Sequence, residues 1–98
     1  MRLGVMITDD RFGAYATGML AAAARRGWEC RCFLTHAGTR VLRLPAFRRL
    51  VEAGTVSAGF CEYSWERFGD GTPPDWAQIG GQYQNAQLVH QCERIVVF

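Results

Sequence analysis

The order of apolar and polar residues along the chain predicts strands separated by helices. Short apolar runs bounded by turn-forming residues have the length of strands, and the longer stretches between them carry helical spacing or helix start and stop signals. The strand-like runs are residues 3–8, 29–34, 56–60 and 94–98. The helix-like stretches are residues 14–26, 39–53, 64–68 and 82–91. This alternation predicts an α/β protein.

The connections between these strands are short, so the strands must pair in parallel through right-handed crossovers. We therefore expect a small flavodoxin-like, doubly wound parallel sheet of about four strands, with helices on both faces. No linker divides the chain and no segment repeats. Residues 1–98 are predicted to form a single α/β domain.

Glycine, proline and aspartate mark the ends of the predicted elements. Gly27 closes the first helix, and Pro45 must interrupt or restart the second. Residues 69–74, GDGTPP, have the composition of an exposed turn. Asp75 is predicted to cap the element that follows.

Side-chain patterns also predict which faces point inward. The predicted inward side chains are Tyr15, Met19, Ala22 and Ala23 in the first helix, and Tyr83, Ala86 and Val89 (or Leu88) in the last. Arg31 interrupts one face of the second strand, which favours an edge position for that strand.

The hydrophobic content of 49% is typical of a globular chain, and no apolar run approaches the ~20 residues that span a bilayer. Asp9 and Asp10 follow the first apolar run too closely for a secretory signal. We therefore expect a soluble, cytoplasmic protein with no membrane partner. A chain of 98 residues with three tryptophans has little capacity to bury them alone, which favours a homo- or hetero-oligomer.

The net charge of +2 comes from arginine, because the chain contains no lysine. A phosphate-binding loop lysine, a Schiff base and the lysine of a receiver-type signalling domain are thereby excluded. The arginines are scattered over predicted helices and form no basic stripe, so no nucleic-acid partner is expected.

Four cysteines in a reducing compartment are expected to remain free thiols. Cys30 and Cys32 alternate along one strand, and their spacing does not fit a zinc site, so no metal is predicted. These two residues and Cys92 are interpreted as packing residues, since free cysteine is commonly buried.

Cys61 has a different position, at the change from strand to helix. A thiol at the carboxyl end of a parallel strand lies where ligands collect, and the backbone N–H groups of a following helix stabilise a thiolate. His36 is expected in a loop at the same edge of the sheet, where it is a less favoured candidate for a base. Glu62 beside the thiol would disfavour the thiolate. A buried core thiol is the alternative interpretation of Cys61.

Several segments together resemble the DsrE-like (DsrE/DsrF) family of small sulfur-relay proteins. Residues 56–64, VSAGFCEYS, resemble the family's strand followed by Cys-x-x-Ser. Residues 79–81, IGG, and residues 92–98, CERIVVF, resemble its closing helix start and final strand. The resemblance implies a persulfide carrier that holds sulfane sulfur on Cys61 and passes it to a partner cysteine, with sulfur donor and acceptor proteins as partners and no cofactor.

Other functions remain open at this stage. A subunit of the same family without transfer activity would serve in assembly or binding, with an incidental cysteine. A receiver domain is disfavoured because a cysteine stands where its aspartate belongs. Arg11 is expected to be solvated rather than to clamp an anion. Residues 69–75 could form a lid over Cys61, or an ordinary connecting loop.

Overall fold

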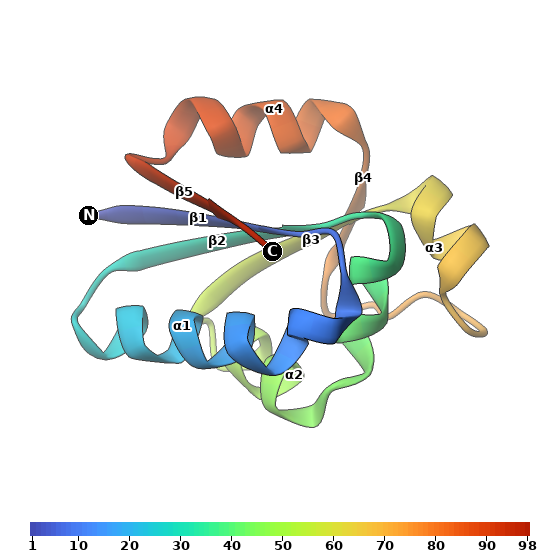
Figure 1. Ribbon diagram of the computed structural model, residues 1–98, viewed down its shortest axis with the longest axis horizontal. Helices are drawn as coiled ribbons and strands as arrows, with labels where there is room; N and C mark the ends of the chain where they lie inside the picture. Colours follow the sequence, from blue (N-terminus) through green and yellow to red (C-terminus); the bar gives the residue numbers. More distant parts are fainter.

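A computed structural model describes residues 1–98, apart from the side chain of Gln82, and its centre is a parallel sheet (Figure 1). The strands are ordered β4-β3-β2-β1-β5, and every neighbouring pair runs in parallel. Their bounds are β1 Arg2–Ile7, β2 Glu29–Leu34, β3 Val56–Cys61, β4 Gln78–Gly80 and β5 Arg94–Val97. The first and last strands are neighbours in the sheet, because β5 pairs with β1.

Helices cover both faces of this sheet, as the sequence predicts. In Figure 1, α4 lies over one face, and α1 and α2 lie over the other. The α-helices are α1 Gly13–Arg25, α2 Pro45–Glu52, α3 Glu62–Phe68 and α4 Gln82–Gln91. Two 3-10 segments, η1 Asp10–Phe12 and η2 His36–Arg43, follow β1 and β2. The doubly wound α/β architecture is confirmed.

The sheet has five strands rather than about four. The additional strand, β4, is the short segment Gln78–Gly80, which pairs with the end of β3. A glutamine and a glycine in three residues leave no apolar run, so hydrophobic patterning gives no signal for it. The order 4-3-2-1-5 also differs from the order 2-1-3-4-5 of flavodoxin itself.

The predictions for Pro45 and Asp75, two residues expected at helix starts, had different outcomes. Pro45 does restart the second helix, since the chain is 3-10 helical up to Arg43 and α-helical from Pro45. Asp75 caps no helix, because the chain enters β4 and α4 begins after Gly81. The prediction for Arg31 is also wrong. Its strand is central, and the guanidinium pairs with Glu29 and donates a hydrogen bond to the side chain of Gln91 in α4.

The two predicted helix faces need correction. Helix α1 buries Ala23 as predicted, together with Ala16 and Leu20. The prediction is wrong for Tyr15, which is 74% exposed, and for the exposed Met19 and Ala22. An alanine-rich helix is apolar on most sides, so its spacing does not select one face. Helix α4 buries Leu88, the residue that fits over Gly4, where an added Cβ would lie 2.9 Å from the Leu88 side chain. Of the predicted residues, the alternative Leu88 is therefore the correct one, and Tyr83, Ala86 and Val89 are exposed.

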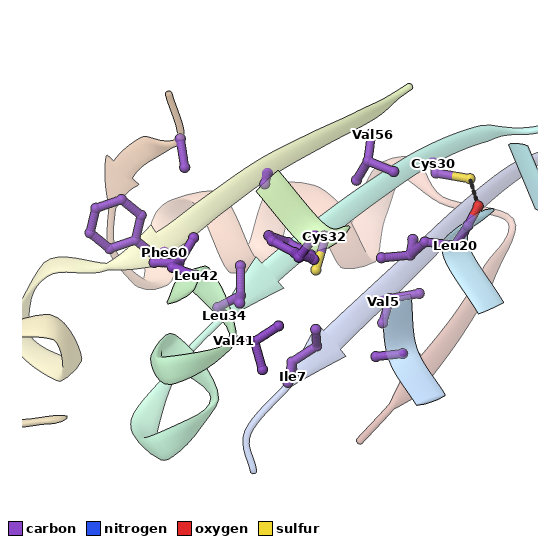
Figure 2. Close-up of a cluster of buried hydrophobic side chains, with 14 of the residues drawn as sticks. Val5, Ile7, Leu20, Cys30, Cys32, Leu34, Val41, Leu42, Val56 and Phe60 are labelled. Atoms are coloured by element: carbon purple, nitrogen blue, oxygen red, sulfur yellow. Dashed lines mark hydrogen bonds between the residues drawn. The ribbon is translucent and has the colours of Figure 1, made fainter. Parts of the chain in front are cut away.

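The main core lies between the sheet and helices α1 and α2 (Figure 2). Alternate residues of the three central strands point into it, as expected for a pleated sheet. The labelled members are Val5, Ile7, Leu20, Cys30, Cys32, Leu34, Val41, Leu42, Val56 and Phe60. A second, much smaller cluster forms on the α4 face, where Phe33, Cys61 and Leu88 are buried.

The connections after β3 and β4 leave toward opposite faces. After β3 the chain forms α3, whose Trp65 joins the main core on the α1 and α2 side. After β4 it forms α4 on the other side (Figure 1). Adjacent parallel strands whose connections diverge in this way open a crevice at their carboxyl ends, the usual position of a ligand site. Cys61 and Gly80, which are register partners, lie at this point.

Candidate functional site

Cys61 is the last residue of β3 and the N-cap residue of α3. Its side chain is on the α4 face, beside Phe33 and Leu88, and is 9% exposed. It nevertheless forms part of the wall of a cavity of about 530 Å³. The lining residues are Cys61, Glu62, Tyr63, Glu66, Gly80 and Gly81. The crevice between β3 and β4 therefore extends up to Cys61.

Hydrogen-bond donors surround the sulfur of Cys61. Burial alone would raise the pKa of this thiol, but donors from three residues outweigh it and hold the pKa below its usual value. They are the hydroxyl and backbone N–H of Ser64, the backbone N–H of Tyr63 and the hydroxyl of Thr35. Tyr63 and Ser64 occupy the second and third positions of α3, whose N–H groups face an N-cap side chain. The thiol forms no cap hydrogen bond of ordinary geometry, but the charged thiolate is the form that these donors stabilise.

Glu62, which is expected to disfavour the thiolate, does not set the net direction of the Cys61 pKa. The carboxylate follows Cys61 directly, yet the pKa of Cys61 is lowered. Glu62 is exposed to solvent, which screens its charge, whereas the donors from Ser64 and Thr35 act in a partly buried site.

Ser64 is held in place by the loop after β2. It is 6% exposed, and its hydroxyl oxygen accepts a hydrogen bond of 2.8 Å from the backbone N–H of His36. The Thr35 hydroxyl lies 3.2 Å from the same oxygen. Since the His36 N–H can only donate, the proton of Ser64 is free to point at Cys61. The site thus joins residues from η2, β3 and α3.

His36 contributes its backbone rather than its imidazole. Its φ of 54° lies in the left-handed region, which is uncommon for a residue with a side chain. This conformation accompanies the N–H bond to Ser64, and the imidazole ring packs against Phe68 with 4.3 Å between ring centres. The sequence correctly places His36 at the same edge of the sheet as Cys61. Its contact there is a main-chain hydrogen bond to Ser64.

The other three cysteines have raised pKa values. Burial raises the pKa of Cys32 strongly, and burial also raises the pKa of Cys30 and of Cys92. The thiol of Cys30 points at the carbonyl oxygens of Leu20 and Trp28, 3.8 and 3.7 Å away (Figure 2 draws the first). Cys30 and Cys32 belong to the main core, as expected of packing residues. Cys92 follows α4 and is partly exposed.

Arg11 is occupied by an acidic neighbour. Its guanidinium pairs with Asp9 at 2.6 Å, and the backbone N–H of Arg11 also donates to that carboxylate. The side chain of Arg11 is 78% exposed. This arrangement agrees with a solvated arginine rather than an anion clamp.

Residues 69–75 are anchored away from the Cys61 cavity. The indole N–H of Trp65 donates to the carbonyl of Gly71 at 3.1 Å, and the N–H of Gly69 donates to the carbonyl of Trp65 at 2.8 Å. None of residues 69–75 lines the cavity at the thiol. The structure therefore favours the connecting loop over the lid.

In the sequence, Ser64 is recognisable as the serine of the Cys-x-x-Ser segment, but its role is not. Thr35 is not recognisable as a site residue at all. The available signal is that Ser64 stands three residues after a helix-capping Cys61, the position whose N–H faces a cap. For Thr35 there is no local signal, because its contact with Ser64 joins residues 29 positions apart.

Fold and site together define a small three-layer α/β protein with one activated thiol in the crevice between two parallel strands. In overall fold the chain is similar to the crystal structure of the YchN protein from Escherichia coli, a protein of DsrE-like fold. The TM-score is 0.69 at 16% sequence identity, and the match covers 100% of both chains. No family model matches the sequence, and no curated protein sequence matches it either.

Two further findings bear on possible functions. Among the described residues, no group of three or more histidine, cysteine, aspartate or glutamate side chains is arranged to hold a metal ion. None of the helices in this part of the chain is long and apolar enough to cross a membrane.

Proposed function

We propose that the protein is a DsrE-like sulfur-relay protein that carries sulfane sulfur as a persulfide on Cys61. The observation that carries this proposal is the contrast among the four thiols, of which Cys61 alone has a lowered pKa. Cys61 also lines the cavity between β3 and β4, whereas Cys32, which borders another hollow, has a raised pKa. A sulfurtransferase needs this combination, because the thiolate is the attacking species. The similarity to the YchN fold supports the same conclusion.

The transfer is two exchanges at sulfur. The Cys61 thiolate attacks the terminal sulfur of a donor persulfide, a new S–S bond forms on Cys61, and the donor leaves as a thiolate with the electron pair of the broken bond. The thiolate of an acceptor protein then attacks the terminal sulfur on Cys61, and Cys61 leaves as the thiolate. No net oxidation occurs and no cofactor is needed. The donors from Ser64 and Thr35 stabilise Cys61 both as nucleophile and as leaving group.

The test is the mass of the intact protein after incubation with excess polysulfide. We expect a gain of about 32 Da, one sulfur atom. The gain should vanish in Cys61→Ser and remain in the matched variant Cys30→Ser. An adduct that persists without Cys61 would move the site to another thiol.

A second candidate is an assembly subunit of a DsrE-like complex. An exposed apolar groove of about 580 Å³ between α1 and β5 favours it. The lining includes Leu3, Met19, Trp28 and Val96. Apolar surfaces of this kind mark contact sites, so we also propose that the chain is a homo- or hetero-oligomer. A solution mass equal to one 11.0 kDa chain would contradict self-association, and absence of any sulfur adduct would leave assembly as the function.

A further inference from the structure

The Cys61 cavity continues into a groove between α3 and β4. A second cavity, of about 320 Å³, shares Glu62 and Glu66 with the first. Beyond the two carboxylates its lining is mostly apolar, with Phe60, Trp65, Pro73 and Ile79 among its members. The two hollows therefore adjoin at the two carboxylates, and together they are called the groove: the thiol is at one end and the apolar lining at the other.

Negative charge in this groove is not neutralised from within the chain. Glu62 and Glu66 are four residues apart on one side of α3, and both are exposed. Among the described residues, neither carboxylate forms an ion pair within 4.0 Å, and no basic side chain lines either hollow.

Two arginines, Arg67 of α3 and Arg40 of η2, lie on another side of α3. Arg40 and Arg67 are positioned over the ring of Phe68, 5.5 and 5.4 Å from its centre. Phe68 itself packs against His36 from η2. These arginines therefore face the η2 side of α3, away from the groove along β4.

We propose that this groove, formed by Glu62 and Glu66 beside Cys61, selects positively charged protein segments as the sulfur partners of Cys61. The partner cysteine would be flanked by arginine or lysine, whose charges complement the two carboxylates as the cysteine approaches the thiol. Small anionic donors such as thiosulfate or polysulfide would react more slowly at the same point, so that they load Cys61 only in excess. This proposal rests on the sulfur-relay function and names its partner class.

The charge of the whole protein would give the opposite preference. The formal net charge is +2, so long-range attraction favours anionic partners. A preference of Cys61 for cationic partners must therefore arise from the local groove, which makes its measurement decisive.

The test uses two synthetic peptides of equal length, Gly-Arg-Cys-Arg-Gly and Gly-Glu-Cys-Glu-Gly. Each cysteine is supplied as its mixed disulfide with thionitrobenzoate. The Cys61 thiolate attacks the peptide sulfur, an S–S bond forms between Cys61 and the peptide, and coloured thionitrobenzoate leaves with the electron pair. The ratio of the two rate constants is divided by the same ratio for a free model thiol, which removes the peptides' intrinsic difference.

We expect the basic peptide to react faster, on the order of tenfold at low ionic strength, and the preference to shrink as salt is added. The double variant Glu62→Gln, Glu66→Gln should bring the corrected ratio close to one or below. Any change that these substitutions make in the reactivity of Cys61 affects both peptides and cancels in the ratio. Glu52→Gln is the matched control, because it removes one carboxylate at the opposite end of β3 and should leave the ratio unchanged.

A corrected ratio of one in the unmodified protein, or a ratio that survives the double variant, would overturn the proposal. Its failure is distinguishable from failure of the sulfur-relay function, because disulfide exchange needs no persulfide. A protein that accepts sulfur on Cys61 but shows no charge preference contradicts the groove alone. A protein with the preference but no sulfur adduct contradicts the relay alone.

Discussion

Cys32 and Cys61 lie on neighbouring strands of one sheet, and both are nearly excluded from solvent, at 3% and 9% exposure. Their pKa values nevertheless move in opposite directions, strongly upward for Cys32 and downward for Cys61. Cys32 points into the main core, where burial is the first cause of its shift. Cys61 points to the other face, where Ser64 and Thr35 supply donors.

Burial and activation are thus separate properties in this sheet. The α1 and α2 face is filled by aliphatic and aromatic side chains, which offer a thiolate no hydrogen bonds. The end of β3 on the α4 face adjoins the start of a helix and a polar loop, both of which present N–H and O–H groups. Residue type alone does not separate a structural cysteine from a reactive one; position relative to helix starts does.

The same substitution at the two sites should have opposite consequences, and this is the largest effect that we expect. Cys61→Ser should remove nearly all rapid alkylation of the native protein, because the other thiols are held protonated. Cys32→Ser should keep that reactivity but lower the free energy of unfolding by about 1–3 kcal/mol, since it buries a hydroxyl in an apolar core. Alkylation kinetics and urea unfolding measure the two effects. If rapid alkylation persisted in Cys61→Ser, a thiol other than Cys61 would be the reactive one, and the contrast between the two faces of the sheet would be wrong.

Removing one donor should weaken the activation of Cys61 without abolishing it. Ser64→Ala should lower the alkylation rate of Cys61 near neutral pH on the order of tenfold, because a hydrogen bond to a charged group is worth about 1.5 kcal/mol. The pH dependence of the rate should shift upward at the same time. Ser57→Ala is the matched control, an exposed serine on the same strand and face but remote from the thiol. An unchanged pH profile in Ser64→Ala would show that the backbone N–H groups suffice.

Most of the fold could be predicted from the sequence because its strands are bounded apolar runs. The runs that became β1, β2, β3 and β5 lie within about two residues of their predicted positions. β4 could not be predicted, because it pairs with β3 through its backbone where the fold brings the two segments together, and its own side chains show no strand pattern. Helix faces were assigned wrongly where apolar residues surround a helix, as in α1.

For the site, the sequence located Cys61 but not the groups around it. A cysteine at a change from strand to helix can be recognised in the local sequence. Its position at the carboxyl edge of the sheet follows from the parallel topology. The contact between Ser64 and the N–H of His36 joins separate elements and requires a left-handed residue that carries a side chain. No sequence pattern predicts such a conformation, so this part of the site could be identified only from the structure.

Alkaline pH should act in opposite directions through the two classes of thiol. Cys61 has a lowered pKa in the folded state, so its contribution to stability is present above its unfolded pKa and is lost as the pH falls through the folded value. Cys32 has a raised pKa, so its contribution is full below the unfolded pKa and declines as the pH rises above it. Around and just below the usual thiol pKa of about 8.5, between about pH 7 and 9, Cys61→Ser should therefore lose stability faster with rising pH than the unmodified protein. Above that pKa, between about pH 8.5 and 10, Cys32→Ala should lose stability more slowly than the unmodified protein. Urea unfolding across this range measures both slopes, and equal slopes in all three proteins would contradict the assigned shifts.

The smallest expected effect concerns the loop from Gly69 to Asp75, which lies on the Trp65 side of α3 and not at the thiol. Replacing Thr72, Pro73 and Pro74 by a Gly-Ser linker should leave the alkylation rates of Cys61 within about a factor of two for both small and bulky reagents. The reason is geometric, because the Trp65 bond to Gly71 holds the loop at the apolar end of the groove, and none of residues 69–75 lines the hollow at the thiol. Stability should fall modestly, since prolines restrict the unfolded chain by roughly 0.4–1 kcal/mol each, so the rates are compared well below the unfolding temperature. A bulky reagent that gains many-fold in rate after the replacement, while a small one does not, would show that the loop closes over Cys61 after all.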